Sequence, residues 1–82
     1  MHDIGDGHDI QETEVTANDI SGRTIEELNS EIPGGCLIAE VGQGEDAHVP
    51  ATDETVDRGD RVTFLGDTSS VRAAVKRFHP RD

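Results

Sequence analysis

The sequence Gly59-Asp60-Arg61-Val62-Thr63-Phe64-Leu65-Gly66 contains the clearest structural signal of the chain. A Gly-Asp pair is typical of a tight turn, because glycine accepts a positive φ and aspartate can hydrogen-bond the backbone ahead of it. In the residues that follow, Val62 and Phe64 alternate with Thr63 and Leu65, which is the period of a β-strand. We expect Gly66 to end this strand, and residues 67–70 offer several helix N-caps.

The C-terminal residues predict an amphipathic helix. Apolar residues recur there at spacings i, i+3, i+4 and i+7, namely Val71, Ala74, Val75 and Phe78. Basic residues in the last turn suit the negative end of the helix dipole, and Pro80 stops the helix.

Upstream of this unit, the pattern predicts three more strands and one more helix. We expect strands at 12–17, 36–41 and 47–49, with 36–41 in the centre of the sheet. Thr24 and Glu27 have the spacing of a capping box, so a short helix should begin there and bury Ile25 and Leu28. The expected order is β-α-β-β-β-α, an α+β fold with a small antiparallel sheet of about four strands and both helices on one face.

Length and charge limit the classes of function. Residues 1–10 have the composition of a flexible N-terminal tail, and 11–82 form a single small domain with a lean core. The 18 acidic residues against 7 Lys and Arg give a net charge of −11, from which we expect no nucleic-acid partner and no binding to an anionic membrane. The acidity fits either an ordinary acidic protein or a halophilic one, whose surface is adapted to concentrated salt.

Compartment signals are few. Cys36 is the single cysteine, so no internal disulfide can form. The chain contains neither a signal-peptide pattern nor an apolar run of the ~20 residues that span a bilayer. We therefore expect a cytoplasmic protein without direct membrane insertion.

The chemistry-bearing residues have simpler explanations as structural residues. His2, Asp3, His8 and Asp9 could bind a divalent metal, but a glycine-rich tail does not preorganise such a site. Cys36 could be a nucleophile with His48 or His79 as base, yet it opens an apolar strand, where cysteine is usually a core residue.

Two acidic positions have alternatives of their own. Asp60 could bind a metal with Asp57 or Asp67, although capping of the turn explains it more simply. Glu40 either faces solvent on the open sheet face or pairs with Arg61. We expect no catalytic residue, metal or cofactor, and hence no enzyme.

Three ordered motifs resemble the TrkA-C family, also called RCK-C, the C-terminal regulatory domain of potassium-conductance regulators. Residues 20–28 resemble the family pattern around Gly-Lys/Arg-Thr, and the later matches are Val49-Pro50 and residues 55–62. Gly66 stands where the family has a glycine before its last helix. The motif residues that this resemblance singles out are Gly22, Thr24, Leu28, Pro50, Gly59, Asp60 and Gly66.

The resemblance implies a dimerising, ligand-sensing module linked to potassium or other cation transport. Its partners would be a second copy of the chain and a cation channel or transporter, or the nucleotide-binding regulatory subunit of one. In some members a small effector such as cyclic di-AMP binds at the dimer interface. Residues 29–36 contain an acid and no base, which argues against a dianionic effector here. The alternative is a free-standing acidic interaction domain that assembles with an unrelated enzyme or carrier.

Overall fold

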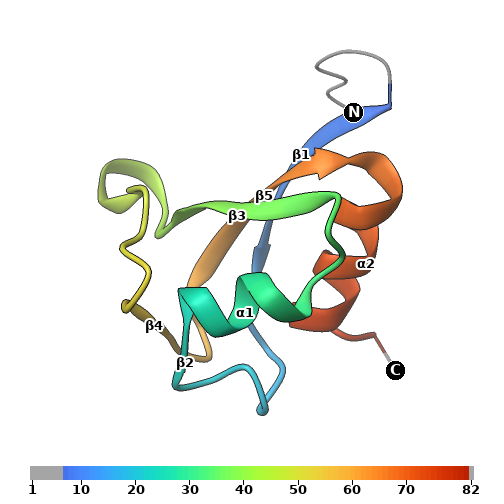
Figure 1. Ribbon diagram of the computed structural model, residues 1–82. Coiled ribbons are helices and arrows are strands. Elements are labelled where there is room, and N and C mark those ends of the chain that lie inside the picture. Colours follow the sequence, from blue (N-terminus) through green and yellow to red (C-terminus); the bar gives the residue numbers. More distant parts are fainter. Residues whose placement is uncertain (1–6, 82) are drawn as a thin grey trace.

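Strand β5 (Arg61–Asp67) forms the centre of a three-stranded antiparallel sheet in the computed structural model, which describes residues 7–81 (Figure 1). Strand β1 (His8–Glu14) pairs with one side of β5, and β3 (Cys36–Val41) pairs with the other. The sequence analysis had placed 36–41 in the centre. That placement is wrong, because β5 pairs with β1 through all seven of its residues and with β3 from Val62 to Gly66, so β5 lies between them.

A separate ribbon of two short strands joins β2 (Arg23–Thr24) to β4 (Thr55–Val56). The expected return strand at 47–49 is reduced to one antiparallel bridge, between Val41 and His48. A 3₁₀ turn, η1 (Gly44–Asp46), precedes that bridge and directs the chain away from β3. The α+β class and antiparallel pairing are thus confirmed, with the expected sheet divided into three strands and a two-stranded ribbon.

Strand β1 begins four residues earlier than expected. His8 pairs with Asp67 and Glu14 pairs with Arg61, so part of the predicted tail is built into the sheet. The predicted 15–17 end of the strand instead turns toward α2, where the N–H groups of Thr16 and Ala17 both donate to the Phe78 carbonyl. Residues 1–6 of the predicted tail lie outside the described residues.

Helix α1 (Ile25–Glu31) begins with the predicted capping box. The Glu27 N–H donates to Thr24 Oγ1 over 3.2 Å, and the Thr24 N–H donates to Glu27 Oε1 over 3.0 Å. Helix α2 (Thr68–Phe78) is capped at its N-terminus by Asp67, whose carboxylate accepts the Ser70 N–H over 2.8 Å. Both starts satisfy backbone donors that would otherwise be open at a helix N-terminus.

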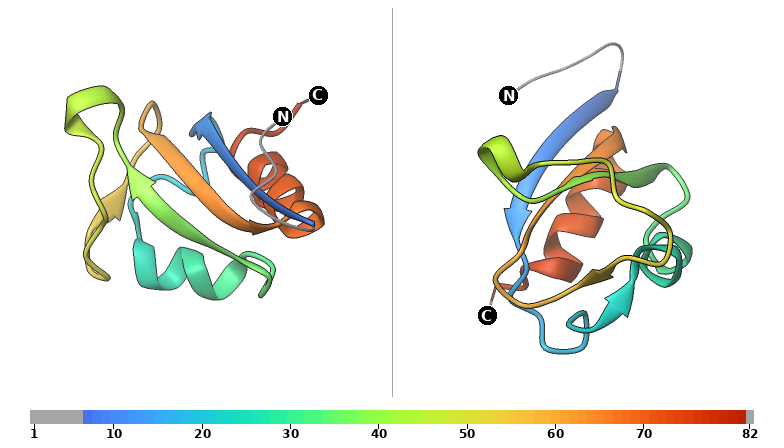
Figure 2. Two further views of the ribbon diagram at one scale, coloured as in Figure 1. Left: turned by 90° about the horizontal axis from the view of Figure 1, so that it is seen from above. Right: turned by 90° about the vertical axis from the view of Figure 1, so that its left-hand side faces the viewer.

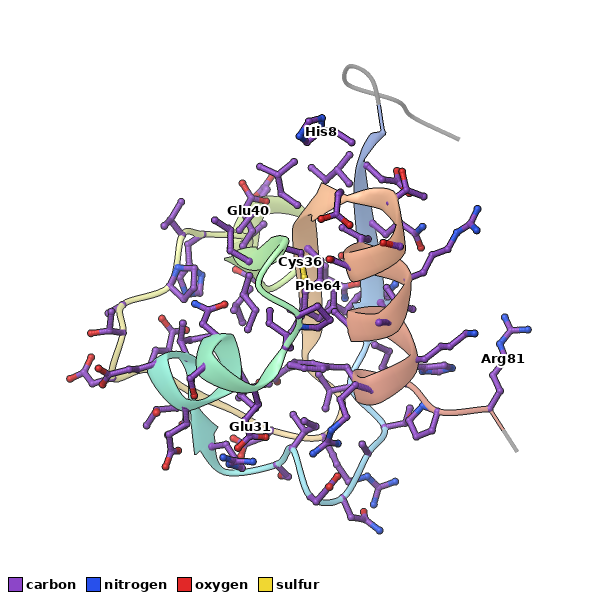
Figure 3. All side chains as sticks on the ribbon, turned by 45° about the vertical axis from the view of Figure 1, so that its right-hand side comes forward. His8, Glu31, Cys36, Glu40, Phe64 and Arg81 are labelled. Atoms are coloured by element: carbon purple, nitrogen blue, oxygen red, sulfur yellow. The ribbon has the colours of Figure 1, made fainter. Side chains whose placement is uncertain are left out.

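Both helices cover the same face of the sheet. Figure 2 (left) shows α2 beside β1 and α1 beside β3. Their inward side chains join those of the strands in one hydrophobic core, in which Phe64 and Phe78 are the largest members (Figure 3). The other buried apolar residues are Val15, Ala17, Ile20, Ile25, Leu28, Ile32, Ile38, Val41, Val56, Val62, Val71 and Ala74. The opposite face of the sheet is left without a covering helix.

Candidate functional site

The predicted Gly-Asp turn has a structural role, because its hydrogen bonds hold the chain that enters β5. Gly59 has φ +92°, as its role in the turn predicts, and its N–H donates to the Val15 carbonyl over 2.8 Å. Asp60 Oδ2 accepts the Asp57 N–H over 2.9 Å. The Asp60 carboxylate thus closes the turn that leads into β5, but it bonds the backbone three residues before it, whereas the sequence analysis expected a bond to the backbone ahead of it.

The other motif residues likewise shape the backbone. Gly22 has φ +84° and donates its N–H to the Val56 carbonyl over 2.7 Å, which starts the β2–β4 ribbon. Leu28 is fully buried, and Pro50 is half-buried beside the turn at 51–54. A Cβ at Gly66 would overlap the Gly35 carbonyl and Cys36. Gly66 therefore permits close approach of the chain before β3, and the strand continues through it to Asp67.

Cys36 does not have the surroundings of a nucleophile. It is half-buried and its Sγ–H donates to the Ser70 carbonyl over 3.6 Å. Burial raises the pKa of the Cys36 thiol, with a smaller contribution from the negative charge of Asp67, so the thiolate is disfavoured. The two histidines considered as its base have other partners: His48 contacts Glu54, and His79 contacts the Glu14 carbonyl.

The acidic candidates are dispersed. Within residues 7–81 no group of three His, Cys, Asp or Glu side chains is placed to hold a metal ion. The Asp9 carboxylate instead accepts the Ile10 N–H over 2.8 Å and the Gln11 amide over 2.9 Å. His2 and Asp3 lie outside the described residues. Glu40 is exposed opposite Thr63 on the open face, which decides between its two interpretations, while Arg61 pairs with Glu12 at 3.1 Å.

The open face of the sheet carries a short apolar row. The register places Ile10 opposite Leu65 on one side and Leu37 opposite Leu65 on the other, so the three side chains lie in line across β1, β5 and β3. Ile10 is 39% exposed and Leu37 is 50% exposed. We call these three residues the open-face row. Exposed apolar side chains in a contiguous row are typical of a protein–protein contact.

Two of three comparisons relate this chain to known proteins. The sequence model of the TrkA-C domain family matches residues 10–79. The structure of BusR from S. agalactiae in complex with its busA-promoter DNA has a similar fold, with a TM-score of 0.66 and 22% sequence identity. The similarity covers 95% of this chain and 40% of the BusR chain. Among curated protein sequences no relative was found.

The BusR structure corrects one expectation. Net negative charge led us to exclude nucleic acid as a partner, yet a protein that contains this fold is found in complex with DNA. The exclusion was wrong because it rested on the net charge of this chain alone. This chain spans less than half of the BusR chain, so its charge does not describe the rest of such a protein. The expectation of no membrane insertion is tested only for the helices: within residues 7–81, no helix is long and apolar enough to cross a bilayer.

Proposed function

Because this chain belongs to the TrkA-C domain family, we propose that it is a cytoplasmic regulatory module that forms a homodimer, senses a small effector and controls potassium or other cation transport. The observation that carries the proposal is the match of residues 10–79 to this regulatory family. The match spans both helices and nearly all of the sheet.

The open-face row supports the dimer. Burying Ile10, Leu37 and Leu65 against the same residues of a second copy would remove apolar surface from water, at roughly 25 cal/mol per Å². A two-fold axis through the centre of the row would place Leu65 near Leu65 of the second copy. A domain of 82 residues buries a small core, so this added burial would be a substantial part of its stability.

The dimer is tested by sedimentation equilibrium of the wild-type chain and of Leu37→Glu. The variant places a charge at one end of the apolar row, within the contact, and should give a monomer of about half the wild-type mass. Ala73→Glu is the matched control, since it adds the same charge at an exposed position on α2 and should leave the dimer intact. A wild-type monomer at tens of micromolar protein, or an unchanged Leu37→Glu dimer, contradicts the use of this face.

The effector is best sought among monovalent cations first. An acidic surface attracts cations and repels dianionic ligands. Melting temperature should be measured with KCl and NaCl at equal ionic strength, and then with a panel of nucleotides. A difference between the two salts, or a shift with one nucleotide, identifies an effector class. Equal melting temperatures in all conditions contradict ligand sensing by this domain.

Regulation of transport is tested in cells. Deletion of the gene should change the rate of rubidium uptake, a tracer for potassium, and the wild-type gene should restore it. Leu37→Glu should fail to restore uptake if the dimer is the active form, whereas Ala73→Glu should restore it. An unchanged uptake rate after deletion contradicts a role in cation transport.

A second candidate is that the same module regulates a DNA-bound assembly, which the similarity in fold to BusR favours. The two candidates differ in what the module is attached to. Purification of the tagged chain from its own cells should recover a membrane transporter or its nucleotide-binding subunit in the first case. A DNA-binding protein among the recovered partners would favour the second.

A further inference from the structure

A groove of about 840 Å³ runs between the free edge of β1 and helix α2. Residues 11–14 form one wall, and the second wall is formed by α2 and the residues that follow it. Figure 2 (left) shows these two elements side by side at one end of the molecule. None of the three residues of the open-face row lines the groove.

The groove gathers much of the positive charge of this acidic chain. Four of the seven Lys and Arg residues line it, against the two acids Glu12 and Glu14, which gives the lining a net charge of +2. Arg61 pairs with Glu12, whereas the other three, Arg72, Lys76 and Arg81, form no ion pair within residues 7–81. The chain as a whole has a net charge of −11, so this wall has the opposite sign to its surroundings.

The backbone of β1 presents unused hydrogen-bonding groups to the same groove. Successive residues of an edge strand point their N–H and C=O groups alternately to the neighbouring strand and away from it. Gly7 and Val15 point toward β5, since the Gly7 carbonyl accepts the Thr68 N–H and the Val15 N–H donates to Asp60. By alternation, the backbone groups of Ile10, Glu12 and Glu14 point to the free edge.

Contacts at both ends limit this free edge to a short segment. The Ile10 N–H donates to the Asp9 carboxylate, and the Glu14 carbonyl accepts a hydrogen bond from His79 Nδ1 over 3.0 Å. Within residues 7–81, no partner meets the groups between them, namely the Ile10 carbonyl, the Glu12 N–H and carbonyl, and the Glu14 N–H. These donors and acceptors alternate along the edge, as a partner strand requires.

The opposite edge of the sheet is interrupted, whereas the middle of β1 is regular. Strand β3 carries an irregularity between Ile38 and Glu40 and is bridged at Val41 by His48. Strand β1 keeps a regular register over seven residues and has no proline or lysine. Soluble proteins usually protect edge strands with such devices, so the regular segment between Ile10 and Glu14, whose outward groups are open, is a candidate for strand addition.

We propose that the groove binds an extended acidic peptide of a partner protein, which adds to β1 as a further strand. The peptide backbone would exchange hydrogen bonds with Glu12, and its carboxylates would pair with Arg72, Lys76 and Arg81. A peptide fits better than a phosphate, because the free edge offers acceptors alternating with donors, whereas a fully ionised phosphate can only accept. Strand addition gives the affinity, and the basic flank gives the preference for acidic side chains.

The test uses the full ¹⁵N-labelled chain and two blocked synthetic peptides, one alternating Val and Glu and the other alternating Val and Lys. Amide spectra are recorded at the lowest KCl concentration at which the protein is folded. The acidic peptide should shift the amide signals of Glu12 and Glu14 and slow their hydrogen exchange at least tenfold. The basic peptide should do neither.

Four variants separate strand addition from simple charge attraction. Glu12→Pro removes the outward N–H without removing a ladder bond to β5, and should weaken binding at least tenfold, whereas Glu12→Gln keeps that N–H and should bind as the wild type does. Arg72→Glu combined with Lys76→Glu should also weaken binding at least tenfold. Arg58→Glu is its control, because Arg58 is an exposed arginine outside the groove.

Four results would overturn the proposal. Equal binding of both peptides would show that the charge of the groove does not discriminate between acidic and basic peptides. Undiminished binding by a folded Glu12→Pro variant, or displacement of the acidic peptide by an equal concentration of pyrophosphate or duplex DNA, would indicate an anion site without strand addition. Slow exchange of the Glu12 and Glu14 amides in the absence of peptide, dependent on protein concentration, would assign the edge to contact between copies. If Glu12→Pro fails to fold, the hydrogen exchange of the Glu12 and Glu14 amides in the wild type, together with competition by pyrophosphate and duplex DNA, still distinguishes strand addition from an anion site.

Discussion

Phe64 of β5 and Phe78 of α2 pack edge to face, with ring centroids 4.9 Å apart and ring planes at 88°. Both side chains are fully buried (Figure 3 labels Phe64). They are the chain's only aromatic residues, so this single contact provides the largest shared burial between the sheet and the last helix. The same end of the helix is also joined to the segment that follows β1, since the Phe78 carbonyl accepts the N–H groups of Thr16 and Ala17.

Phe78→Ala should therefore destabilise the protein severely. Replacing a buried phenylalanine with alanine typically costs about 3–5 kcal/mol, which is a large part of the ~5–15 kcal/mol that stabilises a domain. Urea unfolding followed by circular dichroism measures the loss. Val49→Ala is the control, because Val49 is 78% exposed and should change stability by less than about 0.5 kcal/mol. A Phe78→Ala variant as stable as the control would contradict the packing described.

His48 should titrate above its ordinary pKa. Its Nδ1 lies 2.8 Å from the Asp46 carbonyl oxygen and its Nε2 lies 2.8 Å from Glu54 Oε2. The hydrogen bond to the Asp46 carbonyl and then the one to the Glu54 carboxylate raise the pKa of His48. This contribution to stability is fully present below the unfolded pKa of about 6.5 and is lost as pH rises through the folded pKa. Histidine ring signals followed by NMR from pH 5 to 9 would give the value.

Two substitutions test the cause of that shift. Glu54→Gln removes the carboxylate and should lower the pKa of His48. Asp46→Asn should change it little, because the acceptor of residue 46 is its main-chain carbonyl. Identical titration of His48 in the wild type and in Glu54→Gln would show that the ion pair does not persist in solution.

Gly59→Val should cost roughly 1 kcal/mol or more in unfolding free energy. Gly59 has φ +92°, a conformation that side chains with a Cβ rarely adopt. No neighbouring atom lies within 4 Å of a Cβ placed there, so the backbone conformation alone would produce the loss. Gly34→Ala is the matched control, since that position also has open space and no positive φ, and its stability should not fall. Equal stability of Gly59→Val and the wild type would show that the turn has no need of glycine.

Local signals in the sequence were enough to predict several elements. The capping box needs only Thr24 and Glu27, which are three residues apart, and the start of α2 needs only Asp67 and Ser70. The positive φ of Gly59 follows from the residue type beside an aspartate in a turn. The interactions that define each of these features lie within one turn of the chain, so the sequence contains all of the information.

Other elements depend on distant partners and were missed. Residue His8 joins β1 because Asp67 is available to pair with it, and Arg23 joins β2 because Val56 lies opposite. The groove likewise combines residues 11–14 with the basic side chains of α2. The spacing of Arg72, Lys76 and His79 at i, i+4 and i+7 could have indicated a basic helix face, but no local pattern shows which strand faces it.

The last prediction concerns salt. Many carboxylates on this chain lie within about 10 Å of one another, the Debye length near 0.1 M salt, so their repulsion is only partly screened there and disfavours the compact state. At about 1 M the screening length falls to roughly 3 Å and most surface pairs stop interacting. We therefore expect the melting temperature to rise with KCl between about 0.1 and 2 M.

Replacing three exposed acids that form no ion pair within residues 7–81, Glu45, Asp53 and Asp57, with the corresponding amides should flatten this rise. The control replaces Glu12, whose carboxylate is paired with Arg61, and should flatten it less per charge removed. A parent protein that melts at one temperature across the whole KCl series would show that the acidic surface is not an adaptation of stability to salt.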